Sequence, residues 1–155
     1  MKNAFLFILL LFFSVASTDS SACSIFTNKE AKFHWSLFNG NKKLPAQPTV
    51  EVGDIIRAGD MRDVCSDVAI LTITIPIDSS NPAFAYKFEL VSGNLDPMFR
   101  DKPVLAMLRD GKHNFVFRWI ESTAPPMDIV VKVTAYSRTG KQGGSTNIKI
   151  SDRGR

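Results

Sequence analysis

The side chains best placed for chemistry in this 155-residue chain are four aspartates that surround a cysteine. They are Asp54, Asp60, Asp63 and Asp67, and Cys65 lies among them. Calcium takes several oxygen ligands from a flexible loop, so this segment is a candidate calcium site. The EF-hand spacing is absent, because no glycine lies between Asp60 and Asp67. The alternative is a solvated acidic loop in which nearby arginines supply ordinary ion-pair partners.

Cys23 and Cys65 are the two cysteines of the chain. In an exported protein, an even cysteine count is most simply explained by a disulfide. Such a bond would close a loop of about 43 residues and stabilise the fold by up to about 4 kcal/mol on the chain-entropy model. The alternative is a zinc site that adds His34 and His113, but these four residues lack the short pair spacing of structural zinc sites. We therefore predict a disulfide, and neither a metal nor a cofactor.

The chain carries no recognisable catalytic motif. It lacks a G-x-S-x-G elbow, an H-E-x-x-H pair, a phosphate-binding loop and a dinucleotide fingerprint. His34 and His113 are its two histidines, both interpreted as surface residues, so a serine or cysteine nucleophile has few possible bases. Hydrolysis by a pair of carboxylates is the enzymatic alternative. The favoured interpretation is a protein that is not an enzyme.

Met98 and Phe99 are the predicted partner-binding residues. They stand between charged residues in the segment 95–103. Exposed apolar side chains in such a setting indicate a contact site. The expected partner is an extracellular protein or a glycan.

The first sixteen residues have the pattern of a secretory signal peptide. Lys2 precedes ten residues without a polar side chain, 4–13, and small residues follow. Cleavage is predicted after Ala16, or as late as Ala22. The apolar run is shorter than the roughly 20 residues that a membrane-spanning helix needs, and no comparable segment follows it. The mature chain is thus expected to have no transmembrane segment and to be secreted, either extracellular or periplasmic.

The distribution of charge argues against nucleic acid as a partner. The formal net charge is +4, and it falls to +3 when Lys2 leaves with the signal peptide. The basic residues are scattered, and Lys42-Lys43 is the one adjacent basic pair. Nucleic-acid-binding proteins instead carry a basic patch or stripe on one face.

Alternating apolar and polar residues predict a series of short strands. The predicted strands are 31–38, 49–52, 55–58, 68–75, 86–90, 114–120, 129–136 and 147–150. Gly53-Asp54 is expected to form a turn or bulge, and 140–144 a turn. Many short strands without a credible long helix predict an all-β, antiparallel two-sheet sandwich. This single domain is expected over 24–152, followed by a disordered tail at 153–155.

The segment 101–110 has two interpretations. Asp101 as a cap and Pro103 in a first turn are compatible with a short helix that ends at Gly111. Alternatively, Asp110-Gly111 is a hairpin turn that joins a strand at 104–108 to the aromatic strand after it. The hairpin is favoured, because its partner strand is unambiguous.

The last predicted hairpin resembles the final two strands of fibronectin type III and related immunoglobulin-like domains. The resemblance rests on Val131 to Tyr136, a glycine-containing turn, and the alternating residues 147–150. The cysteine, tryptophan, cysteine pattern of immunoglobulins is absent, so no functional residue is carried over. The resemblance implies a secreted, non-enzymatic immunoglobulin-like module for binding or structure. The alternatives are the carboxylate hydrolase and a subunit of an exported surface fibre.

Overall fold

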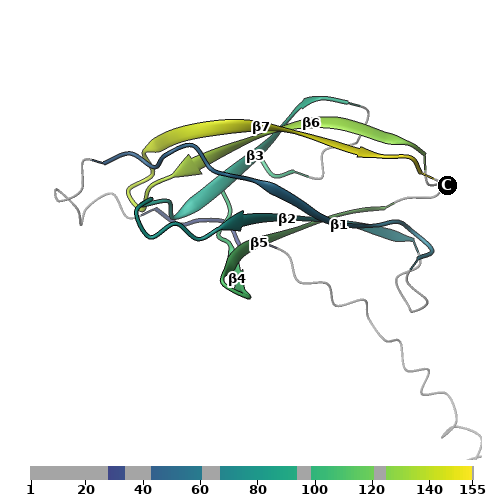
Figure 1. Cartoon of the computed structure of the whole chain (residues 1–155), viewed down its shortest axis with the longest axis horizontal. Helices are drawn as coiled ribbons and strands as arrows, with labels where there is room; N and C mark the ends of the chain where they lie inside the picture. The colour runs from purple at the N-terminus through teal and green to yellow at the C-terminus, as the bar shows by residue number, and fades with distance from the viewer. Residues whose placement is uncertain (1–27, 34–42, 61–66, 94–98, 121–124, 155) are drawn as a thin grey trace, which may run out of the picture.

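The chain forms only strands and loops in the part that the computed structural model describes (Figure 1). Those residues are 28–33, 43–60, 67–93, 99–120 and 125–154. Seven strands form two sheets in which all neighbouring strands are antiparallel. The predicted all-β fold with two antiparallel sheets is thus confirmed.

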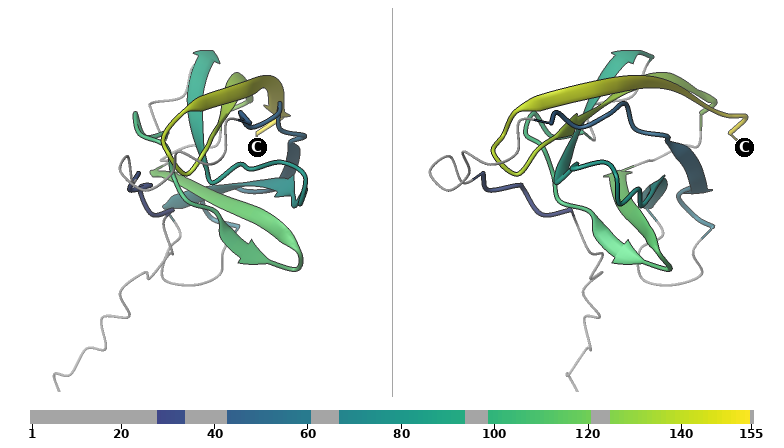
Figure 2. Two further views of the ribbon diagram at one scale, coloured as in Figure 1. Left: turned by 90° about the vertical axis from the view of Figure 1, so that its left-hand side faces the viewer. Right: turned by 60° about the vertical axis from the view of Figure 1, so that its left-hand side comes forward.

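The first sheet has four strands in the order β1-β2-β5-β4, and the second has three in the order β3-β6-β7. Their bounds are β1 Glu51–Ile56, β2 Val68–Pro76, β3 Ala85–Ser92, β4 Met107–Arg109, β5 Lys112–Ile120, β6 Met127–Tyr136 and β7 Gln142–Asp152. Figure 2 shows the β4–β5 hairpin (green) and β7 (yellow) on opposite sides of the molecule. The two sheets therefore form two layers.

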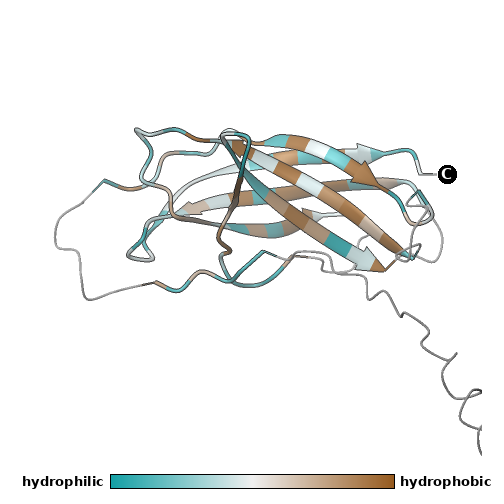
Figure 3. Ribbon diagram, turned by 90° about the horizontal axis from the view of Figure 1, so that it is seen from below, coloured by the Kyte–Doolittle hydropathy of each residue, from teal (hydrophilic) through white to brown (hydrophobic). Residues whose placement is uncertain are grey.

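Period-two alternation places one hydrophobic core between these layers. Along β2, every second residue from Ala69 to Ile75 is buried, and hydrophobic and polar residues alternate along the strands (Figure 3). Phe115 and Phe117 of β5 contact Phe88 from the other sheet, with ring centroids 4.9 and 4.8 Å apart. Burial of apolar surface of this kind is the main favourable term in folding. Phe88, Phe115 and Phe117, which lie in predicted strands, are thus residues of the hydrophobic core.

The ambiguous segment before β5 forms the hairpin, and the helix interpretation of 101–110 is wrong. β4 pairs with β5 across the turn at Asp110 and Gly111, whose φ angles are 50° and 70°. Two successive residues with positive φ are typical of the type I′ turn, which Asp-Gly favours. The strand is shorter than predicted, because Val104 instead makes isolated bridges to Glu30 and Tyr86.

Glycines explain two features of the edge strands. The register of β1 shifts between Val52 and Ile55, so the predicted irregularity at Gly53-Asp54 is a bulge inside one strand. The predicted turn at 140–144 is wrong in part, because Gly143 and Gly144 lie within β7. A Cβ atom on Gly143 would lie 2.2 Å from the carbonyl oxygen of Pro45. These glycines thus allow the segment before β1 to approach the edge of β7.

The segment 28–33 connects the two layers beside β3, away from the β7 edge. Only 31–33 of the predicted strand 31–38 are described, and they form no regular strand. The amide of Ala31 instead donates to Pro103 O, and that of Leu105 donates to Lys29 O. The side chain of Asn28 hydrogen-bonds to both backbone groups of Val116 in the four-stranded sheet. The ring of Phe33 lies 6.1 Å from that of Tyr136 in the three-stranded sheet, measured between centroids. One short segment thus contacts both sheets.

Candidate functional site

A hollow lined by described residues lies on the outer face of the four-stranded sheet. Its volume is about 720 Å³, within the range of about 300–1,000 Å³ typical of small-molecule sites. We call it the outer-face groove. It is lined by Gly53, Asp54, Thr72, Thr74, Met107, Leu108, Arg109, Asp110, Asn114 and Val116.

Strand register explains why these residues meet. Thr72 lies opposite Val116, and Thr74 opposite Asn114, so the floor consists of two cross-strand pairs of β2 and β5. Met107 of β4 in turn lies opposite Asn114. The hairpin that carries β4 projects below the sheet in Figure 1 and supplies one wall. On the other side, Gly53 of β1 has no side chain to fill the space above Thr72.

Hydrogen bonds within the sheet fix the polar groups of the floor. The side-chain amide of Asn114 donates to the carbonyl oxygens of Arg109 and Lys112, each at 3.1 Å. Its Oδ1 atom is therefore left as an acceptor. The hydroxyl of Thr74 donates to Glu51 at 3.4 Å. Lys112, at 2.7 Å from the same carboxylate, holds the pKa of Glu51 below its usual value, mainly by its hydrogen bond.

Two carboxylates stand among the lining residues, and they differ in their partners. Asp110 pairs with the Nε atom of Arg109 at 3.5 Å. Asp54 forms no ion pair with any residue that the structure describes. The groove therefore offers one carboxylate, two threonine hydroxyls and an amide oxygen to a ligand.

The three described residues of the proposed calcium set, Asp54, Asp60 and Asp67, are not grouped as metal ligands. Asp54 lines the groove, whereas a carboxylate oxygen of Asp60 accepts the backbone N–H of Arg57 at 3.1 Å. Asp67 directly precedes β2, and Asp63 lies outside the described residues. Across the described ranges, no three histidine, cysteine, aspartate or glutamate side chains are grouped to hold a metal. His34 and both residues of the predicted disulfide, Cys23 and Cys65, also fall outside these ranges.

Of the two predicted partner-binding residues, only Phe99 is described. Its ring lies 4.8 Å from that of Phe117 and 6.3 Å from that of Phe88, measured between centroids. Phe99 is partly buried against the core, so its ring has a packing role. Met98 lies outside the described residues, and a partner site at this pair stays a prediction.

A second polar site, which joins the two layers, was not apparent from the sequence. Tyr86 of β3 and His113 of β5 approach across the end of the core, with the hydroxyl 3.4 Å from Nδ1. They line a small cavity of about 90 Å³ together with Asp78. Burial, and secondarily the charge of Asp78, raises the pKa of Tyr86 to about 12. The ring of Tyr86, from the other sheet, packs against the imidazole with centroids 5.8 Å apart. His113 is therefore half-buried, and its interpretation as a surface residue is wrong in part.

Protonation of His113 is expected to weaken the fold. Burial holds the pKa of His113 below its ordinary value of 6.5, so the unfolded chain binds this proton at a higher pH than the folded chain. The free energy of unfolding should therefore fall as pH drops through about 6.5. Urea unfolding at about pH 7.5 and about pH 5.5 measures the change.

A His113→Gln variant provides the control, because glutamine keeps a polar side chain without a titrating proton. Its stability should change less than that of the wild type over the same pH interval. Equal changes in the two proteins would contradict the assignment of this pH dependence to His113.

The fold and the groove define an all-β protein with a polar hollow on one sheet face. No family model matches the chain, and neither a curated protein nor a solved structure matches it. In the described ranges, no helix has the length and apolar character needed to cross a membrane.

Proposed function

We propose that this chain is a secreted, non-enzymatic immunoglobulin-like module that binds an extracellular partner through the outer-face groove. The observation that carries the proposal is the groove itself, a hollow of about 720 Å³ on a rigid sheet face. Except for Asp110 in the hairpin turn, its polar lining residues belong to strands, and strands hold side chains more precisely than loops do.

Strand order supports the immunoglobulin-like class. Lettered A to G in chain order, the strands form an A-B-E-D sheet and a C-F-G sheet. This is the arrangement of constant-type immunoglobulin domains. All seven positions are filled, which weakens the fibre-subunit alternative, because strand donation needs a vacant position.

Secretion is supported by the leader pattern at the start of the chain. Lys2, the apolar run and the small residues before Ala16 form the three regions of a signal peptide. Both predicted cleavage positions precede Asn28, the first residue whose contacts the structure describes. Cleavage at either position would leave every described contact intact.

Site-specific photo-cross-linking tests the proposal. A photoreactive phenylalanine analogue would replace Leu108, a groove residue that is 74% exposed. We expect it to form an adduct with a partner from the medium or periplasmic fluid of the producing cells. The same analogue in place of Lys149, whose side chain is 66% exposed on β7 of the other sheet, is the matched control.

The expected result is an adduct from position 108 and none from position 149. Equal labelling from both positions, or no adduct from position 108, would contradict binding of a macromolecular partner through the groove.

A further inference from the structure

The way in which the groove presents its polar groups restricts the ligands that it can bind. The backbone groups of its floor are already engaged, because β2 and β5 pair continuously from Val68 to Pro76. An extended peptide binds to sheets by hydrogen bonds to a free strand edge, and the groove floor is a face between two paired strands. A ligand in the groove must therefore be recognised by side chains.

Apart from Arg109, the polar side chains of the groove present mainly acceptors. The N–H groups of Asn114 are used within the hairpin, which leaves its Oδ1 atom. Thr74 directs its proton towards Glu51 and so keeps its lone pairs. Asp54 adds a carboxylate, which accepts hydrogen bonds only. A complementary ligand must therefore bring several donors at short spacing.

The charge and the apolar residues of the groove further restrict the class of ligand that it can bind. Arg109 is paired with Asp110, so the lining carries no excess of positive charge for an anionic ligand. Val116, Met107 and Leu108 supply apolar surface beside the acceptors. A sugar ring has both hydroxyl donors and an apolar C–H face, so it matches this combination. Protein–protein hot spots are instead rich in aromatic residues, and the groove lining contains none.

We propose that the outer-face groove binds an uncharged oligosaccharide, with sugar hydroxyls donating to Asp54, Asn114 and Thr74. This inference rests on the proposed function and names the ligand class of the same site. The volume of the groove fits a ligand of a few sugar units. Vicinal hydroxyls can donate in pairs to the carboxylate, and such charge-assisted hydrogen bonds are the strong ones.

Amide NMR titration of the ¹⁵N-labelled exported protein tests the ligand class. The probes are neutral trisaccharides of glucose, mannose, galactose and N-acetylglucosamine, with trigalacturonate as the anionic comparison. We expect at least one neutral probe to shift the amide resonances of Thr72, Thr74 and Val116 and to leave that of Lys149 unmoved. The absence of a groove response to every neutral probe would overturn the inference, as would a stronger response to trigalacturonate.

An Asp54→Asn variant tests the role assigned to the carboxylate. Removing one charged acceptor should weaken saccharide binding about tenfold. Asp128→Asn is the matched control, because Asp128 lies on the other sheet and pairs with Lys149. A dispersed spectrum shows that each variant folds, and unchanged affinity of Asp54→Asn would contradict the assignment.

The two proposals fail in different ways. A cross-link from position 108 to a protein, without any saccharide response, would leave the groove as a binding site and overturn the oligosaccharide inference. The absence of both a cross-link and a saccharide response would overturn both proposals.

Discussion

An Arg57→Ala substitution is expected to lower the free energy of unfolding by about 2–3 kcal/mol, because it removes a buried guanidinium together with its ion pair and hydrogen bond. Arg57 is only 4% exposed. A loss of this size is a large share of the roughly 5–15 kcal/mol that stabilises a typical domain. Urea unfolding of the wild type and the variant, followed by circular dichroism, measures the change.

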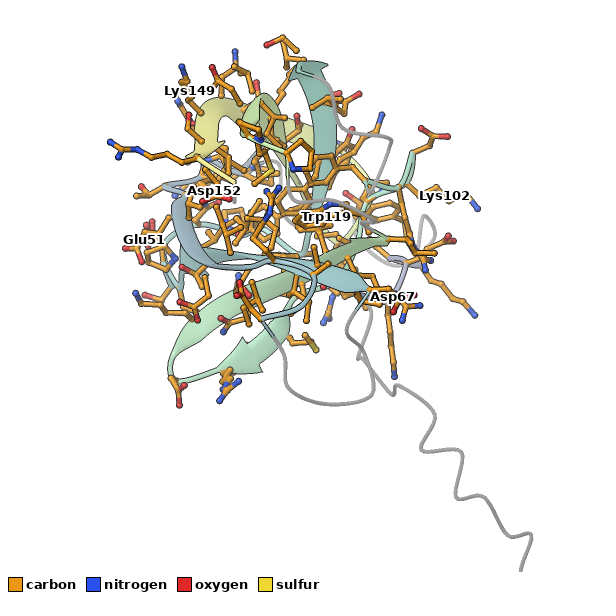
Figure 4. The ribbon with its side chains drawn as sticks, turned by 90° about the vertical axis from the view of Figure 1, so that its right-hand side faces the viewer. Glu51, Asp67, Lys102, Trp119, Lys149 and Asp152 are labelled. Atoms are coloured by element: carbon orange, nitrogen blue, oxygen red, sulfur yellow. The ribbon has the colours of Figure 1, made fainter. Side chains whose placement is uncertain are left out.

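The contacts of Arg57 explain why the effect should be large. The residue directly follows β1 of the four-stranded sheet, and its guanidinium lies 3.2 Å from the carboxylate of Asp152 at the end of β7. It also donates to Pro125 O before β6 and lies 6.0 Å from the ring centroid of Trp119. Figure 4 looks onto this end of the molecule and labels Asp152 and Trp119. One cation therefore links both sheets and the chain segment between β5 and β6.

A Lys149→Ala variant is the matched control for Arg57→Ala. Lys149 pairs with Asp128 at 3.2 Å, but both side chains are 66% exposed. Exposed ion pairs contribute little to stability, so this variant should unfold close to the wild type. Equal losses from the two substitutions would contradict the role assigned to Arg57.

An Asn28→Ala substitution is expected to cost about 2–4 kcal/mol, because two backbone groups of Val116 lose their partner. The Asn28 amide donates to Val116 O at 3.0 Å, and Val116 N–H donates to Asn28 Oδ1 at 3.1 Å. In this way one side chain takes the place of a neighbouring strand at the edge of β5, beyond the end of β4. Asn28 is 6% exposed, and buried groups without hydrogen bonds are costly.

Two further variants distinguish the loss of the Asn28–Val116 hydrogen bonds from a general effect of removing an asparagine. Asn28→Asp has the same shape but no N–H donor, so it should also destabilise the fold. Asn147→Ala removes an exposed asparagine from β7 and should have little effect. If Asn28→Ala unfolds at the same urea concentration as Asn147→Ala, the edge-pairing role is wrong.

Local patterns in the sequence predict much of the fold. The β-branched run from Val68 to Ile75 predicts β2, and Asp110-Gly111 predicts the β4–β5 hairpin. Each signal is predictive because its own residues are neighbours in the sequence. The full length of β7 is not apparent from the sequence. The predicted strand 147–150 stops short of Asp152, which is the last residue of β7 and pairs with buried Arg57.

Sequence patterns do not predict which residues meet in the groove. The sequence makes Asp54 a candidate calcium ligand, but its neighbours in the groove depend on strand register. Thr72 and Thr74 belong to a β-branched run that predicts a strand, and their polar alternation indicates an outward face. Their neighbours on β4 and β5 depend on pairing between segments that are distant in the sequence. Asn28 and Val116, which are 88 residues apart, are a second example.

Filling the groove is the most direct test of its role in binding. A Thr72→Arg substitution would place a long side chain on the groove floor without entering the core, because Thr72 lies on the outer face of β2. Ser145→Arg adds the same side chain to an exposed position of β7. We predict that Thr72→Arg abolishes the cross-link from position 108 while Ser145→Arg preserves it. An undiminished cross-link from folded Thr72→Arg protein would contradict binding through the groove.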